Sequence, residues 1–262
     1  MYATLKVESP EPGVLVVTLN RPEVRNAFNT EMATELLDLW TRLIAGLGDE
    51  RCVILTGAGR FFSAGQDVAV FLESGGDVPF RRHLERTYNR VVLRLRRLEK
   101  PVVAAINGAA AGAGLGIALA TDIRLAAQSA RFFFGFTGLG LAADSGTSLI
   151  LPLLIGLARA TEMAFTNEPL TAEQALAFGL VNRVAPDDDL PAVAAELGAS
   201  LAAGPTRALG LTKRAFNRAL ASAWETTLDY EAHLQEIAGR TQDFKEGAAA
   251  FVEKRPPHFT GR

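Results

Sequence analysis

The sequence predicts an α/β fold with a helical C-terminal part, and three observations support this. Short apolar runs typical of buried strands alternate with amphipathic helical segments through the first half of the chain. From about residue 171 onward the pattern is almost wholly helical. With 262 residues, 48% of them hydrophobic, the chain is long enough for one substantial core.

The expected elements follow in order along the chain. Strands are predicted where β-branched and other apolar residues run together, at 14–19, 53–56, 102–106 and 123–127. Helices are predicted from apolar periodicity or small-residue content at 30–47, 81–98 and 109–120. We expect a core over residues 1–195 and a helical oligomerisation region over 196–262, with no low-complexity linker between them.

Composition excludes several classes of function. The net charge of −2, with 21% charged residues, gives no reason to expect a nucleic acid or a membrane surface as partner. The single cysteine, Cys52, excludes an intrachain disulfide, and its place in an apolar run predicts a packed thiol. His83, His233 and His258 are scattered, so we expect no metal site and assign them to surface or packing positions. Without a signal-peptide pattern or a membrane-spanning run, we expect a cytoplasmic protein.

Three segments combine glycine with other small residues, at 61–67, 107–116 and 140–148. The second follows a predicted strand but has neither the dinucleotide-binding spacing nor a phosphate-loop lysine. It fits either close packing of small residues or close approach of a ligand to main-chain N–H groups.

The third segment contains Asp144, just before an apolar stretch with Pro152. From local sequence, Asp144 is an N-cap candidate, and Pro152 predicts a kink or a break in the helix that follows. The arginines of 81–98 are interpreted as a solvated helix face.

These segments, in this order and spacing, resemble the crotonase (enoyl-CoA hydratase/isomerase) superfamily over essentially the whole chain. The resemblance begins at Leu19-Asn20-Arg21-Pro22 and includes Phe62-Ser63-Ala64-Gly65-Gln66-Asp67 and Lys100 to Gly108. It ends with Glu246-Gly247 and Phe251 to Arg255. It implies a spiral of repeated strand–strand–helix units and a homotrimer or a dimer of trimers. It also implies an acyl-CoA substrate and no cofactor beyond the coenzyme A of that substrate.

The resemblance also implies an oxyanion hole, formed by two main-chain N–H groups that stabilise the enolate of a thioester. The matching positions are Ala64 and Ala113. It further places Arg25, Ala27, Gln66, Asp67, Gly112, Phe136 and Lys254 among the substrate-binding residues. Arg25 and Lys254 are candidates for the coenzyme A phosphates, and the phenylalanines of 132–136 are candidates either for an acyl pocket or for ordinary core.

The chain departs from the hydratases of the family at two positions. Gly116 and Phe136 stand where those enzymes carry their two glutamates. Asp144 lies in a loop similar to that of ring 1,2-epoxyphenylacetyl-CoA isomerases, in which the aspartate is the acid/base, although Ala143 replaces the usual proline. One carboxylate is enough to move a proton between two carbons, whereas hydration divides its work between two.

We therefore expect an isomerase that shifts a double bond in an acyl-CoA, with Asp144 as its acid/base, in phenylacetate or fatty-acid breakdown. Three alternatives remain open on the sequence. They are an enoyl-CoA hydratase, a hydrolase or dehalogenase with Asp144 as nucleophile, and a non-catalytic acyl-CoA-binding subunit.

Overall fold

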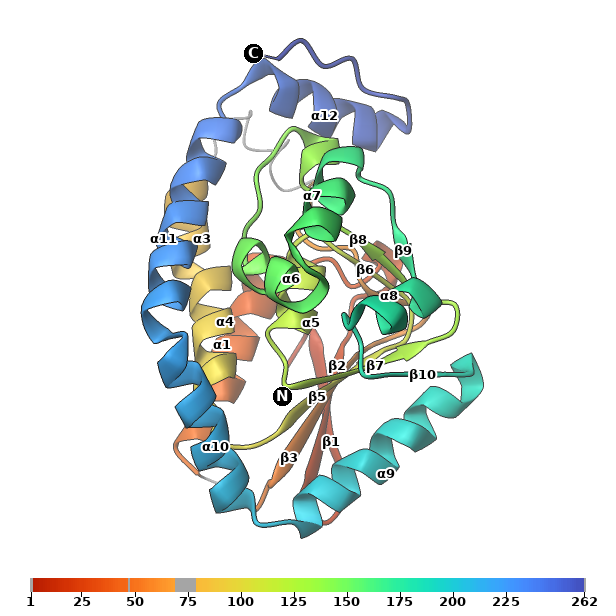
Figure 1. Ribbon diagram of the computed structural model, residues 1–262, viewed down its shortest axis with the longest axis vertical. Helices are drawn as coiled ribbons and strands as arrows, with labels where there is room; N and C mark the ends of the chain where they lie inside the picture. The colour runs from red at the N-terminus through yellow and green to blue at the C-terminus, as the bar shows by residue number, and fades with distance from the viewer. Residues whose placement is uncertain (1, 47, 69–78, 262) are drawn as a thin grey trace.

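The fold is built on two sheets whose strands alternate along the chain (Figure 1). The computed structural model describes residues 2–46, 48–68 and 79–261. The larger sheet has six strands in the order β1-β2-β3-β5-β7-β10, and every neighbouring pair except β1-β2 is parallel. Their bounds are β1 Leu5–Glu11, β2 Val14–Leu19, β3 Cys52–Gly57, β5 Val102–Ile106, β7 Ile123–Ala127 and β10 Arg183–Ala185.

The smaller sheet takes one short strand from each repeat of the chain. Its order is β4-β6-β8-β9, with bounds β4 Phe61–Ser63, β6 Ala109–Ala111, β8 Arg131–Phe133 and β9 Leu170–Thr171. Strands β3 and β4, β5 and β6, and β7 and β8 are therefore successive pairs, each of which adds one strand to each sheet. A helix follows each pair, which confirms the predicted spiral of strand–strand–helix units.

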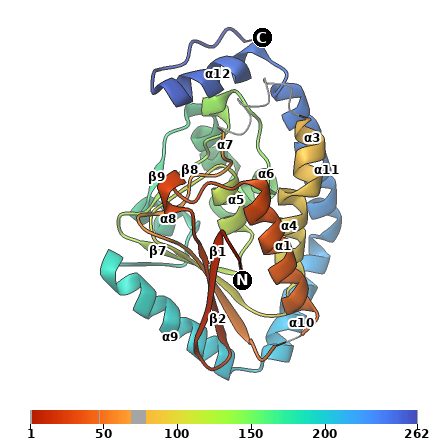
Figure 2. The same cartoon turned by 180° about the vertical axis from the view of Figure 1, so that it is seen from behind.

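The helices surround these sheets and extend well beyond them at the C-terminal end (Figures 1 and 2). The first half contributes α1 Thr30–Ile44, α3 Phe80–Arg86, α4 Tyr88–Arg97 and α5 Ala113–Leu119. The second contributes α6 Thr147–Ile155, α7 Leu157–Thr166, α8 Ala172–Phe178, α9 Leu190–Ala203, α10 Thr206–Ala219, α11 Ala221–Ala238 and α12 Gln242–Glu253. Single turns of 3-10 helix lie at η1 Pro22–Val24, η2 Thr137–Leu139 and η3 Asp187–Asp189.

Several predicted boundaries need correction. The helix predicted at 109–120 begins only at Ala113, because residues 109–111 pair with β4 and β8, and this pairing overrides the helix propensity of alanine. The arginine-rich helix is divided at Thr87 into α3 and α4. Residue 195 lies inside α9, which packs on the larger sheet, so the helical region does not begin there. Pro152 lies within α6, and the break follows at Gly156.

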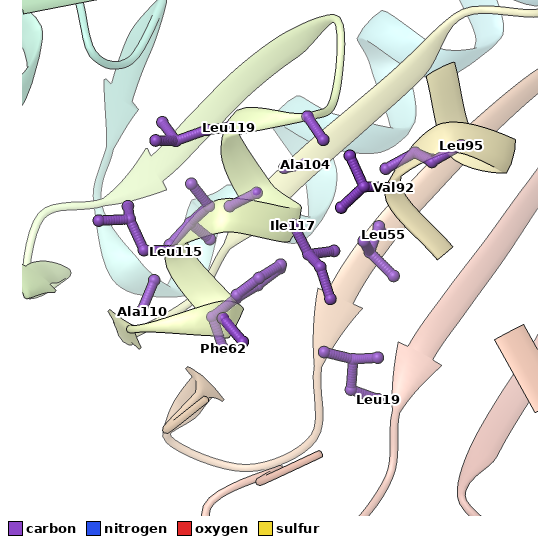
Figure 3. Close-up of a cluster of buried hydrophobic side chains, with 14 of the residues drawn as sticks. Leu19, Leu55, Phe62, Val92, Leu95, Ala104, Ala110, Leu115, Ile117 and Leu119 are labelled. Atoms are coloured by element: carbon purple, nitrogen blue, oxygen red, sulfur yellow. The ribbon is translucent and has the colours of Figure 1, made fainter. Parts of the chain in front are cut away.

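One hydrophobic core connects both sheets and the helices between them. Figure 3 shows side chains of β3, β5, α4 and α5 facing one another, among them Leu55, Ala104, Val92 and Ile117. Cys52 is fully buried in this core, and burial raises the pKa of its thiol to about 12, which confirms the predicted packed thiol.

One arginine of the predicted solvated face behaves differently. Arg96 is largely buried and donates to the carbonyl of Ala120 and to Asp122 and Asn217.

Candidate active site

A cavity of about 640 Å³ opens between the turns that follow β4 and β6, the loop before α6, and the C-terminal helices. Its wall contains every residue predicted for the site. They are Arg25, Ala27, Ala64, Gln66, Asp67, Gly112, Ala113, Phe136, Asp144 and Lys254. The C-terminal helix α12 and the residue that follows it contribute Phe251, Val252 and Lys254 to the same wall. The part of the chain predicted to mediate oligomerisation therefore also forms part of the site.

The turn after β4 is held against the segment after β2 by buried polar contacts. Ser63 Oγ donates to the carbonyl of Asn26 over 2.8 Å and accepts from the amide of Gly65. Arg21 forms an ion pair with Asp67 at 3.1 Å and donates to the carbonyl of Ala27. Asp67 is thus paired with a cation, and this ion pair holds the turn after β4 against the segment after β2.

The main-chain donors differ from the prediction at one position. The amide of Ala64 donates to the carbonyl of Arg25 at 3.0 Å, so it is not available to a ligand. The neighbouring amides of Gly65 and Asp67 are also paired, with Ser63 Oγ and the carbonyl of Phe28. Within the described part of the chain, the amide of Gln66 donates to no acceptor. Ala64 is therefore replaced by Gln66 as the free donor of this turn.

The second predicted donor, Ala113, has the expected geometry. It is the first residue of α5, so its N–H has no partner within the helix, and no described residue accepts from it. Gly112 precedes it with φ +51°, a conformation that favours glycine. A Cβ atom built on Gly65 would lie only 3.3 Å from the amide nitrogen of Ala113. The two turns are thus in contact, and their free amides belong to one wall of the cavity.

The carboxyl group of Asp144 lies in another part of the cavity wall, with 5% of the residue exposed. Its Oδ1 accepts from Ser145 Oγ at 2.7 Å, and its Oδ2 accepts from the side-chain amide of Gln235 at 3.0 Å. Burial raises the pKa of Asp144 to about 6, and these two hydrogen bonds oppose that rise because they stabilise the charged form. A carboxyl group with this pKa can exchange a proton near neutral pH.

Asp144 does not cap the helix that follows. The N-cap residue of α6 is Gly146, and no side chain of its own caps the helix. Glu231 of α11 accepts from the amides of Gly146 and Ser148 at 2.8 and 2.9 Å. Because Glu231 binds these amides, the side chain of Asp144 is not needed to cap the helix and can face the cavity.

The two positions at which the hydratases carry glutamates, 116 and 136, are packed against neighbouring residues. A Cβ atom on Gly116 would lie 2.6 Å from Ser145 Cβ and 2.8 Å from Thr147 Oγ1, so α5 packs directly on the loop that carries Asp144. No side chain fits there unless that loop moves. Phe136 is buried in the cavity wall and packs edge-on against Phe134. Phe133 also lines the cavity, whereas Phe132 is fully buried in the core.

Three carboxyl groups of the described residues line the cavity. Glu23 is exposed near its edge, and Asp67 is paired with Arg21. Asp144 is therefore the buried carboxyl of the lining that has no cation partner among the described residues. The same part of the chain contains no cluster of three histidine, cysteine or acidic residues that could hold a metal ion.

Two lining residues carry exposed positive charge, Arg25 and Lys254. Arg25 lies in a left-handed turn at φ +56°, with its guanidinium 5.3 Å from the centre of the Phe61 ring. Lys254 ends α12 with φ +55° and is exposed. Both side chains can attract an anionic group of a ligand that extends from the cavity into solvent.

Sequence reasoning missed three residues of the site. Tyr88 and His83 both contact the side-chain oxygen of Gln66, and burial lowers the pKa of His83. His83 thus lines the cavity, while His233 and His258 are exposed as predicted. Gln235 is almost fully buried beside Asp144. Nothing in the local sequence distinguishes these residues from ordinary packing residues of amphipathic helices.

No described helix is long and apolar enough to cross a membrane.

Comparison with known proteins identifies the family. Residues 9–262 match the family model for enoyl-CoA hydratase/isomerase. The chain is 44% identical to a 1,2-epoxyphenylacetyl-CoA isomerase of Escherichia coli K12, over 96% of this chain and 97% of that protein. It is 42% identical to a probable enoyl-CoA hydratase of Rhodobacter capsulatus, over 100% of this chain and 99% of the other.

Comparison of the fold with solved structures leads to the same family. A crystal structure of an enoyl-CoA hydratase from Mycobacterium avium subsp. paratuberculosis superposes with a TM-score of 0.87 at 36% identity. The match covers 99% of this chain and 100% of that one. The chain therefore belongs to the enoyl-CoA hydratase/isomerase family of enzymes.

Proposed function

We propose that this enzyme is an acyl-CoA isomerase that moves a carbon–carbon double bond, with Asp144 as its single acid/base. The observation that carries the proposal is the contact between α5 and the Asp144 loop. Gly116 touches Ser145 and Thr147, so the loop that brings Asp144 to the cavity fills the space that a glutamate at 116 would need. The pair of carboxylates that divides the work of hydration is thus replaced by one.

In the proposed reaction, Asp144 removes a proton from the α carbon of a 3-enoyl-CoA. The electrons move onto the thioester oxygen, which accepts hydrogen bonds from the amides of Gln66 and Ala113 as its charge grows. Asp144 then returns the proton to the γ carbon, and the double bond closes between the α and β carbons. No atom is gained or lost, so neither water nor a cofactor is required.

The proposal assigns the remaining lining residues to binding. Arg25 and Lys254 hold the phosphates of coenzyme A at the edge of the cavity. Phe133 and Phe136 contact the acyl group. Because the aromatic wall suits a ring, and because the Escherichia coli relative is a 1,2-epoxyphenylacetyl-CoA isomerase, ring epoxides of that kind are included among the proposed substrates, which would place the enzyme in phenylacetate breakdown.

A substrate panel tests the function. We expect cis- and trans-3-enoyl-CoAs to be converted to conjugated 2-enoyl-CoAs, followed by the rise in thioester absorbance. Crotonyl-CoA should lose no absorbance in the same assay, because addition of water needs the second carboxylate. Rapid hydration of crotonyl-CoA would identify a hydratase. An acyl-aspartate trapped on Asp144 would identify a hydrolase, and tight binding without turnover would identify a binding subunit.

We also propose that the chain assembles as a homotrimer or a dimer of trimers. Large apolar side chains are exposed outside the cavity, including Leu157 at 71% and Phe165 at 81% on α7 and Phe216 at 67% on α10. Light scattering coupled to size-exclusion chromatography tests this, and a monomer at micromolar concentration would contradict it.

A further inference from the structure

The loop that carries Asp144 is bound to α11 by two buried side chains one helical turn apart. Glu231 and Gln235 have only 2% and 1% of their surface exposed. Residues i and i+4 of a helix share one face, so both reach the same loop. Glu231 holds the end of the loop through Gly146 and Ser148, and Gln235 holds its beginning.

Gln235 uses both ends of its side-chain amide. Its Oε1 accepts from the amide of Ala142 at 3.0 Å, and its Nε2 donates to Oδ2 of Asp144 at 3.0 Å. This orientation is required, because the opposite one would place NH₂ against the main-chain N–H and oxygen against the carboxylate. The bond to Ala142 therefore fixes which group of Gln235 faces Asp144.

The consequence for Asp144 is a fixed carboxylate. Each of its oxygens accepts one hydrogen bond, from Ser145 or from Gln235, and keeps another lone pair. A side chain held at both oxygens cannot rotate freely about its last torsion. Since proton transfer depends on a near-attack geometry, such a restraint contributes directly to rate.

We propose that Gln235 is a positioning residue for the proton-transferring carboxyl: anchored on Ala142, it holds Asp144 in the orientation that the substrate meets. Helix α11 thereby takes part in catalysis by orienting Asp144. This inference rests on the isomerase function proposed above.

The charged and titratable groups around Asp144 set what a pH profile will show. Glu231 faces it from α11, and Tyr88 faces it from α4. His83 of α3 lies further along the cavity wall, on Gln66. The hydrogen bond from Gln235 lowers the pKa of Asp144, against burial, which raises it. Loss of that bond should move the acid limb of activity to higher pH.

Two variants test the proposal, Gln235→Leu and Gln235→Glu, with His233→Gln as a control at an exposed position of the same helix. In Gln235→Leu we expect kcat to fall about 10- to 100-fold, with KM changed less than about 3-fold. The acid limb of kcat/KM should rise by about half a pH unit to one unit. Gln235→Glu keeps the acceptor for Ala142 but places a second carboxyl beside Asp144, so its acid limb should rise further. His233→Gln should match the wild type.

An unchanged kcat and acid limb in both variants would overturn the proposal. If Gln235→Leu folds poorly, Gln235→Glu still decides, because it keeps the size and the loop contact. A ¹³C NMR titration of the Asp144 carboxyl, assigned by its absence in Asp144→Asn, gives a readout independent of turnover. A raised Asp144 pKa in the variants supports positioning even if the wild type isomerises nothing, in which case only the proposed reaction fails. An unshifted titration contradicts the positioning role.

Discussion

The two walls of the cavity are built in different ways. One wall presents main-chain N–H groups of Gln66 and Ala113, from turns that follow β4 and β6. The other presents one side chain, Asp144, held by Gln235 of α11, which is 91 residues further along the chain. The first wall belongs to the repeated strand–strand–helix units, whereas the second depends on the helical C-terminal part.

This difference determines which substitutions each wall tolerates. Main-chain donors survive most changes of side chain, because every residue except proline carries an N–H. The second wall depends on the identity of single buried polar residues. A change there removes a function or leaves a partner unsatisfied. We therefore expect a single side-chain substitution in the second wall to have a large effect on activity. In the first wall, only a change that removes a main-chain N–H group should do so.

The largest effect is expected from Asp144→Asn. Among the described residues, the lining has no other buried carboxyl group free of a cation to take over the proton, so kcat should fall about 1000-fold or more. Affinity for a non-reactive acyl-CoA, measured by calorimetry, should stay within about 3-fold. Asp188→Asn, at an exposed position, serves as the control. Turnover in Asp144→Asn close to that of the control would remove Asp144 from the mechanism.

The next effect tests the main-chain wall. Ala113→Pro removes one N–H, and proline is well accepted at the first position of a helix. We expect kcat/KM to fall about 100- to 1000-fold, the usual effect of losing one oxyanion donor. Ala113→Gly keeps the N–H and should retain activity within about 5-fold. Equal losses in both variants would show that the side chain, and not the amide, matters at this position.

A third prediction concerns pH and stability. The pKa of Asp144 is raised to about 6 from an ordinary 3.8, so the folded protein holds this proton where the unfolded chain has lost it. Stability from this group is therefore present below about pH 4, falls between about pH 4 and 6, and stays lost above. Asp144→Asn should raise the free energy of unfolding at pH 8 by up to about 3 kcal/mol. Urea denaturation should show that gain vanish near pH 4, and a gain that is independent of pH would contradict the assignment.

The contact that excludes a glutamate at 116 can be tested by a smaller change. Gly116→Ala places a methyl group against Ser145 and Thr147, so we expect a loss of about 1–3 kcal/mol in unfolding free energy. Activity should also fall, because the Asp144 loop must shift. Gly204→Ala serves as the control, because Gly204 has an ordinary φ. Gly156→Ala is unsuitable, because Gly156 has a φ of +81°. Full stability and activity in Gly116→Ala would show that the contact between α5 and the Asp144 loop leaves room for a side chain at position 116.

The smallest effect is expected at the edge of the cavity. Arg25→Gln removes one exposed cation from the proposed phosphate contact, so KM for acyl-CoA should rise about 3- to 10-fold with little change in kcat. The salt dependence of KM should weaken in the same variant. Arg183→Gln, at an exposed position of β10, is a matched control. An unchanged KM would remove Arg25 from coenzyme A binding.

Much of the fold and the site could be predicted from the sequence, but not the contacts between distant segments. The strands were predictable because apolar runs are local signals, and the spiral was expected from the resemblance to the family. The assignment of Ala64 was wrong because its amide is bound by a carbonyl 39 residues earlier, at Arg25, which no local pattern indicates. Gln235 was missed for the same reason, since a glutamine on an amphipathic helix has no mark of the carboxylate it contacts.

The strand at 109–111 shows a related limit. Three alanines favour a helix by propensity, yet they lie between β4 and β8 and complete a sheet. The conformation of 109–111 is set by its strand partners β4 and β8, which belong to two other repeats. Propensity therefore predicts an element well only where its neighbours do not impose another conformation.

The most direct test of the proposed chemistry follows oxygen from the solvent. A 3-enoyl-CoA is incubated with the enzyme in H₂¹⁸O, and the products are analysed by mass spectrometry. One carboxyl that moves a proton predicts a 2-enoyl-CoA of unchanged mass, formed without labelled oxygen and absent with Asp144→Asn. An ¹⁸O-labelled 3-hydroxyacyl-CoA that accumulates as fast as the isomer would contradict the account.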